Sequence, residues 1–176
     1  TGSDSDLKNT YDNLLEFNKV LSETLNNNLA KCAEISADSV RDACCSAENI
    51  LTDDINKFYT STEDCKTPEI VLTFKNPIEF NAFILQEVVE LGHRVTEYEV
   101  SAFTDSKWEV LYSGECIGYR SARHFTTVIA DKIKIKINSA LASPVLRFFG
   151  LYRFDENLLL DKEYALSDEN ILNSKT

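Results

Sequence analysis

Two hydrophobic periods divide this chain of 176 residues. Between Tyr11 and Leu25, apolar residues recur three and four positions apart with no Gly or Pro among them, which predicts an amphipathic helix. Asn26-Asn27-Asn28 ends that pattern. From Pro68 onward, apolar residues alternate with polar ones, which is the period of strands that bury one face. The pattern therefore predicts one helix followed by a mainly β domain.

The alternating positions form a series of short predicted strands. They are Ile70 to Phe74, Phe83 to Leu85, Tyr98 to Ala102, Trp108 to Tyr112, Ile133 to Ile137 and about Val145 to Phe154. Turn signals stand between them at Lys75-Asn76-Pro77, Leu91-Gly92, Asp105-Ser106 and Ser113-Gly114. Many short strands at this spacing indicate an antiparallel sandwich or jelly roll. Because Trp108 lies in an alternating run, we expect its side chain in the core.

Net charge limits the classes of partner. The chain carries 29 acidic against 18 basic residues, a formal charge of −11, which argues against nucleic acid and anionic lipid because both select basic surfaces. Its hydrophobic content of 43% is that of a globular protein, and no apolar run approaches the roughly 18 residues of a membrane span. We therefore expect a globular domain with no nucleic-acid partner and no membrane span.

Five cysteines leave one unpaired, whatever disulfides form. Cys44 and Cys45 are neighbours, so a bond between them would be strained, but either can reach Cys65 if the two loops lie together. The alternative is five free or buried thiols in a reduced setting. The sequence leaves both arrangements open.

The sequence shows no catalytic constellation. Glu97 and Glu99 lie two residues apart on a predicted strand and point the same way, whereas glycosidase carboxylates face each other across a sugar at roughly 5–9 Å. The two histidines, His93 and His124, have no Ser or Cys with an acid nearby in the sequence. We therefore expect no catalytic residue in this chain itself.

Basic and aromatic side chains gather in the turns between the predicted strands. The planar fork of Arg94 suits bidentate hydrogen bonds to adjacent sugar hydroxyls, and the ring of Tyr119, beside Arg120, suits stacking on a sugar face. An alternative is that Arg94 fixes its own loop by pairing with Glu87 or Glu90. Tyr119, equally, can cap the end of the barrel and do nothing more.

Several spaced motifs agree in order with one known family. They are Asn28-Leu29-Ala30-Lys31, Glu48 to Asp54, Leu91-Gly92-His93-Arg94-Val95, Ile117-Gly118-Tyr119, Ala142-Ser143-Pro144 and Phe149-Gly150-Leu151-Tyr152. From Asn28 to about Tyr152 the chain resembles the galactose-binding-like (discoidin, coagulation-factor C-type) β-sandwich at the C-terminus of α-L-fucosidase-like glycoside hydrolases.

The resemblance implies an organisation and a function. Residues 28–154 would form a jelly-roll β-sandwich, residues 1–27 a linker and helix that end a missing upstream domain, and residues 155–176 an acidic tail. The sandwich would be a non-catalytic module that binds terminal galactose or fucose of glycans. It would contact the catalytic domain of a secreted, periplasmic or lysosomal parent enzyme. Two alternatives remain: a purely structural module that packs on the catalytic domain, and a discoidin-like adhesion module.

The same resemblance places a sugar site in the end loops. It implies that Arg94 anchors the sugar, with Glu87, Tyr119 and Arg120 around it. His93 joins this set, although it stands where the fucosidases more usually have Gln.

A second stretch, Asn56 to Ser61, resembles the loop where relatives carry an aromatic pair, often followed by a sugar-contacting His. Tyr59 stands where Trp is usual, and Thr60 where that His would be, so Tyr59 is a candidate sugar-binding ring. The alternative is that Phe58 and Tyr59 are core residues at a loop-to-strand junction.

A loop of acidic residues resembles one that wraps a structural Ca²⁺ in many relatives. Its candidate ligands are Asp53 and Asn56, with Asp54 between them. Such a site needs six or more oxygens, and Phe148 stands where relatives usually add a Glu. The alternative is a turn that is stable without an ion.

Overall fold

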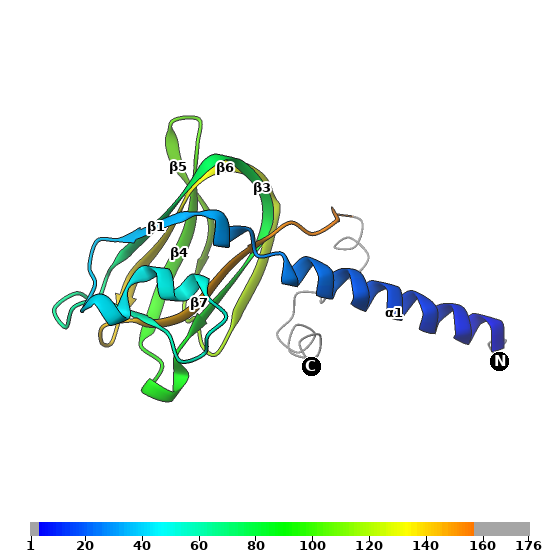
Figure 1. Ribbon diagram of the computed structural model, residues 1–176, viewed down its shortest axis with the longest axis horizontal. Coiled ribbons are helices and arrows are strands. Elements are labelled where there is room, and N and C mark those ends of the chain that lie inside the picture. Colours follow the sequence, from blue (N-terminus) through cyan, green and yellow to red (C-terminus); the bar gives the residue numbers. More distant parts are fainter. Residues whose placement is uncertain (1–3, 157–176) are drawn as a thin grey trace.

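A computed structural model describes residues 4–156 (Figure 1). Its elements, in chain order, are α1 (Asp4–Asn26), η1 (Leu29–Cys32), β1 (Glu34–Ala37), η2 (Ala43–Cys45), η3 (Ala47–Leu51), β2 (Tyr59–Thr60), β3 (Glu69–Glu87), η4 (Val89–Leu91), β4 (Val95–Thr104), β5 (Lys107–Gly114), β6 (Ser121–Ala140) and β7 (Val145–Tyr152). The predicted helix and the mainly β antiparallel sandwich are confirmed, and the helix begins at Asp4 rather than Tyr11. Apart from residues 155 and 156, the predicted acidic tail lies outside the described residues.

The strands form one hydrogen-bonded path that is folded into two layers. Its order is β2-β7-β3-β6-β4-β5, with β1 beside β3, and every pair is antiparallel. β3 and β6 have 19 and 20 residues and curve over from one layer to the other (Figure 1). Ile70 of β3 pairs with Ile135 in one layer, and Ile84 pairs with Ala122 in the other. The two long strands therefore belong to both layers of the sandwich.

The turn predicted at Lys75-Asn76-Pro77 is wrong, because β3 continues through it. The pairing of β3 with β6 is interrupted between Thr73 and Ile78, where the strands bend. Proline has no amide hydrogen to donate, and Pro77 lies in this interruption. The chain changes layer at this point without reversing direction.

The core lies between the layers and follows the predicted alternation. Ile133, Ile135 and Ile137 are fully buried, whereas the three lysines between and before them are not. Phe83 of β3 and Phe149 of the neighbouring strand β7 stack in the core with ring centroids 6.2 Å apart. Each such side chain stabilises the fold by about 1.5–3 kcal/mol through removal of apolar surface from water.

Trp108 is not in this core, contrary to the prediction. Between β4 and β5 the register shifts so that Val100 pairs with Tyr112 and Ser101 with Val110, which leaves Leu111 as an extra residue. Such a bulge moves the following side chains to the other face of the sheet. Tyr112 therefore packs inward, while Trp108 points outward with 37% of its surface exposed.

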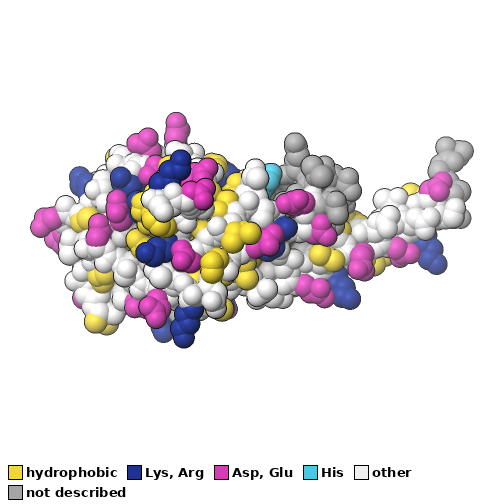
Figure 2. All heavy atoms as spheres, turned by 90° about the horizontal axis from the view of Figure 1, so that it is seen from above, with side chains coloured by type: hydrophobic (Ala, Val, Ile, Leu, Met, Phe, Trp, Pro, Cys, Tyr) yellow, Lys and Arg dark blue, Asp and Glu magenta, His cyan; other side chains and the backbone are white. Residues whose placement is uncertain are grey.

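The last turns of α1 pack on the outer face of the layer that contains β7. Leu21 and Leu25 are buried there in a second apolar cluster with Ile84, Phe148 and Tyr152. The rest of α1 projects away from the sandwich, and acidic and basic side chains are interspersed over the face seen from above (Figure 2). Within residues 4–156, no helix combines the length and apolar character that a membrane crossing requires.

Two buried asparagines tie the ends of the sandwich chain to its strands. Asn28 donates from Nδ2 to the Phe149 carbonyl at 3.3 Å and accepts from the Leu151 amide at 3.0 Å, beside β7. Asn81, in β3, makes the same pair of bonds to the carbonyl and amide of Phe154, at 2.9 and 2.8 Å. Their side chains thereby satisfy backbone groups that would otherwise be buried without partners.

All five cysteines are free thiols in the structure.

Candidate functional site

Four loops meet at one end of the sandwich, and Glu87 joins two of them. The Glu87 side chain is 1% exposed, and its Oε1 accepts hydrogen bonds from the backbone amides of Arg94 and Val95 at 2.7 and 3.0 Å. The Glu87 amide donates to the Gly118 carbonyl at 3.2 Å. One buried residue thus fixes both the turn that carries His93 and Arg94 and the turn that carries Tyr119. Glu87 therefore braces the two turns through its Oε1 and its amide, while its Oε2 is buried and has no hydrogen-bond partner among residues 4–156.

Arg94 spans two of these loops with its guanidinium. Nη1 donates to the Ser143 carbonyl at 2.9 Å and Nε donates to the Leu91 carbonyl at 3.4 Å. Ser143 in turn donates from its hydroxyl to the Thr62 carbonyl at 3.0 Å. The structure does not show the alternative, a side-chain pair of Arg94 with Glu87 or Glu90. Glu87 accepts from the backbone amide of Arg94 and not from its guanidinium. The sequence could not indicate Ser143, because it lies 49 residues away.

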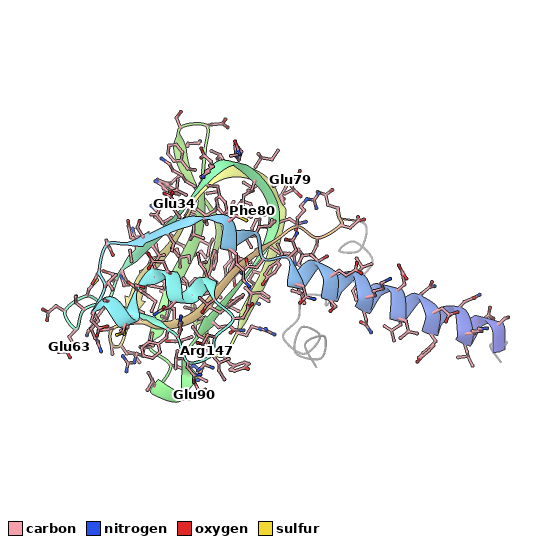
Figure 3. The ribbon with its side chains drawn as sticks, in the orientation of Figure 1. Glu34, Glu63, Glu79, Phe80, Glu90 and Arg147 are labelled. Atoms are coloured by element: carbon pink, nitrogen blue, oxygen red, sulfur yellow. The ribbon has the colours of Figure 1, made fainter. Side chains whose placement is uncertain are left out.

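Glu90 binds a different arginine. Its Oε2 lies 3.1 Å from Nη2 of Arg147, and the two side chains meet below β7 in Figure 3. Backbone hydrogen bonding and Arg147 lower the pKa of the exposed Glu90 carboxyl. Arg94 is therefore free of carboxylate partners among residues 4–156, and its positive charge is available to a ligand.

Tyr119 and Arg120 separate to opposite environments. The Tyr119 side chain is 53% exposed, next to Gly118, whose φ of +66° favours glycine. Arg120 is 7% exposed, and in the amide orientation that satisfies both groups, Gln86 accepts from its Nε at 2.9 Å and Nη2 at 3.2 Å. The exposed members of the predicted site at this end are therefore His93 and Tyr119, with Arg94 half-buried between the loops.

Tyr59 lies in the core rather than at the surface. Its ring has no exposed area, and its hydroxyl donates to the Ser39 carbonyl at 2.6 Å. Burial, aided by the charge of Asp38, raises the pKa of the Tyr59 phenol. A ring with both faces covered cannot stack on a sugar, so the structure corresponds to the core alternative for this position.

The acidic loop does not gather the ligands of a calcium site. Asp53 pairs with Lys31, whose Nζ lies 2.5 Å from Oδ2. Asp54 accepts from the backbone amide of Asn56 at 2.9 Å, which closes the turn without an ion. Phe148 is buried where a further carboxylate was needed. Among residues 4–156, no three acidic, His or Cys side chains are grouped as metal ligands would be.

The fold is that of β-sandwich modules known from glycan-degrading enzymes. The crystal structure of chitosan-binding module 1 from a Paenibacillus chitosanase/glucanase superposes with a TM-score of 0.65, over 72% of this chain and 98% of the module. The identity is 18%, so this likeness concerns the fold alone. No protein-family model matches the chain.

Sequence similarity extends to proteins named as fucosidases. The Oryza sativa subsp. japonica protein provisionally named alpha-L-fucosidase 1 is 27% identical over 143 residues, which cover 79% of this chain and 28% of the rice protein. The crystal structure of a Bacteroides thetaiotaomicron protein, likewise provisionally named an alpha-L-fucosidase, is 28% identical with a TM-score of 0.74. It aligns over 77% of this chain and 30% of the bacterial one. The chain thus spans less than a third of these relatives, and the expected likeness to a fucosidase-associated β-sandwich is confirmed.

Proposed function

We propose that this chain is the non-catalytic accessory module of an α-L-fucosidase-like glycoside hydrolase, and that its end loops bind terminal galacto- or fuco-configured sugars. The discoidin-like and galactose-binding character belongs to this proposal, as does a secreted, periplasmic or lysosomal parent enzyme. Similarity to fucosidases over the sandwich supports the accessory role.

One observation carries the sugar-binding part. Glu87 holds the turn of His93 and Arg94 and the turn of Tyr119 to the same strand end. An exposed aromatic ring and a cation without a carboxylate partner therefore lie in adjoining loops of a braced end of the sandwich. A sugar ring presents C–H groups that pack on an aromatic face, and its hydroxyls accept from a guanidinium.

Tyr119→Ala gives the cleanest test, because the side chain is exposed and its loss should not affect folding. We expect the dissociation constant for galactose or L-fucose, measured by NMR titration, to rise about fivefold, the equivalent of about 1 kcal/mol. Arg94→Ala should weaken binding as well, and it should also lower the melting temperature because the bonds to Leu91 and Ser143 disappear. Arg153→Ala, whose side chain pairs with Glu79, is the matched control and should leave binding unchanged.

A purely structural module is the second candidate, and α1 favours it. Its first turns expose apolar side chains, with Leu7 and Tyr11 more than 60% exposed and Leu14 and Leu15 about half exposed. Such a row of residues is suited to packing on another part of the parent enzyme. If the second candidate is correct, no sugar will shift any resonance at millimolar concentration, and Arg94→Ala will change only the melting temperature.

A further inference from the structure

A cavity of about 450 Å³ lies beside the sandwich, and its lining residue Arg147 links it to Glu90, in the turn that leads to His93. Its walls are the last turns of α1, the acidic loop and β7, with Leu25, Asp54, Arg147, Phe148 and Tyr152 among the lining residues. The volume is that of small-molecule sites. The apolar wall of Leu25 and Phe148 faces a polar rim. Because α1 supplies one wall, the cavity exists only when the helix is packed on the sandwich.

Tyr152 differs from the other buried tyrosines of the core. The hydroxyl of Tyr59 donates to Ser39, and that of Tyr98 lies 2.7 Å from the hydroxyl of Ser121. The Tyr152 side chain is also fully buried, but its hydroxyl has no hydrogen-bond partner among residues 4–156. The phenol is protonated at neutral pH, and burial raises its pKa further. A buried tyrosine hydroxyl usually has a partner, and the absence of one here points to a ligand.

Arg147 adds a second donor without an acceptor. Its Nη2 donates to Glu90, whereas its Nε is buried and has no partner within the described part of the chain. Asp53 and Asp54 face the cavity from the acidic loop, and Lys31 pairs with Asp53 at the rim. The two positive charges of Arg147 and Lys31 balance the two negative charges of the acidic loop. The cavity is therefore suited to a neutral ligand that both accepts and donates hydrogen bonds and has an apolar face.

We propose that this cavity is a second sugar-binding site, specific for a neutral sugar. Sugar hydroxyls accept from Tyr152 and Arg147 and donate to Asp54, while the ring packs on Phe148. The two donor atoms have no exposed surface, so sugar binding at these atoms requires the side chains that cover them to shift. This inference rests on the proposed function in one respect, since it assigns the same ligand class to a different place.

Replacing the hydroxyl of Tyr152 tests the site without removing its ring. Without a ligand, Tyr152→Phe should keep or raise the melting temperature, because a buried hydroxyl without a partner is lost. Tyr98→Phe is the matched control and should lower the melting temperature, since its hydroxyl bonds to Ser121. With sugar, Tyr152→Phe should raise the dissociation constant at the cavity about fivefold, and Tyr98→Phe should leave it unchanged.

NMR titration of the whole chain with L-fucose and galactose, with glycerol as a control, distinguishes the two sites. The inference predicts saturable shifts at residues 22–28, 52–55 and 147–152 that Tyr152→Phe weakens. Shifts confined to residues 91–94, 117–120 and 142–144 would overturn the inference and leave the proposed function intact. Shifts at the cavity alone would support the inference and reject the end-loop site. An unresponsive cavity, or equal shifts with glycerol, would overturn it.

Discussion

Gly150 is required at its position by the ring of Tyr152. A Cβ atom at residue 150 would lie 2.4 Å from the Tyr152 hydroxyl oxygen and 2.7 Å from its Cζ. The Tyr152 side chain therefore folds back along β7 and lies flat on the backbone of Gly150. Glycine is needed here because it has no side chain to collide with the ring. Its φ angle is not positive, so backbone conformation does not require it.

We expect Gly150→Ala to lower the free energy of unfolding by about 1–3 kcal/mol, because the added methyl group displaces the Tyr152 ring from its packed position. Urea unfolding measures this. In the background of Tyr152→Ala the same change should cost much less, since the conflicting ring is gone. Equal costs in the two backgrounds would show that residue 150 and Tyr152 do not interact.

Sequence could predict part of the candidate site. A turn at Gly92 lies where the sequence predicts one, and His93 next to it is exposed. The partner of Arg94, the Ser143 carbonyl, could not be predicted because it depends on how distant loops meet. The lack of a hydrogen-bond partner for the Tyr152 hydroxyl could not be predicted either, because a hydrophobic pattern indicates burial but not hydrogen-bond partners.

The helix α1 has two parts with different energetic roles. Leu21 and Leu25 are 3% and 6% exposed in the outer cluster, whereas Leu14 is 47% exposed. These residues share one stripe of the helix, but the sandwich covers only its end. Most stability of a helix in a protein comes from the packing of such a stripe.

Leu21→Ala should therefore lower the free energy of unfolding by about 2–5 kcal/mol, as expected for a buried leucine. Leu14→Ala is the control on the same helix and should change it by less than about 0.5 kcal/mol. Thermal and urea unfolding test both variants. A small effect of Leu21→Ala would mean that α1 does not pack on the sandwich, and would also remove one wall of the proposed cavity.

Periodicity predicted elements better than it predicted the layer or the face. Ile133 to Ile137 follow a strict alternation, and their burial agrees with it. In β5 the bulge at Leu111 puts residues on its two sides onto opposite faces of the sheet, although the sequence alternates through it. The prediction that Trp108 lies in the core is therefore wrong. In β3 the signal at Pro77 marked a real irregularity, but one sequence cannot distinguish a bend from a reversal.

At the scale of the whole molecule, buried phenols link folding to alkaline pH. Burial raises the pKa of Tyr98 to about 12, from an ordinary value near 10, and it also raises those of Tyr59 and Tyr152. The unfolded chain loses these protons first as pH rises. The stability that these three protonated tyrosines contribute to the folded state is complete below pH 10. It is lost as the pH rises through their pKa values in the folded state.

We therefore expect the free energy of unfolding to fall between about pH 10 and 12, by about 1.4 kcal/mol per pH unit for each such tyrosine. Urea unfolding at pH 8 and at about pH 11 measures the difference. Tyr98→Phe should reduce the alkaline loss. If stability is independent of pH across this window, the three phenols must ionise without unfolding.

The bonds of Asn28 also bear on association between copies of the chain. On the side away from β3, β7 has a strand partner only at Val145 and Leu146 within the described residues. Beyond that point, an unpaired row of amides and carbonyls would offer a template on which another chain could add as a strand. Asn28 occupies the Phe149 carbonyl and the Leu151 amide. Two groups on this side of β7 are thus already bonded within the chain, and η1 and η3 lie against the same strand, which leaves fewer backbone groups for another chain to pair with.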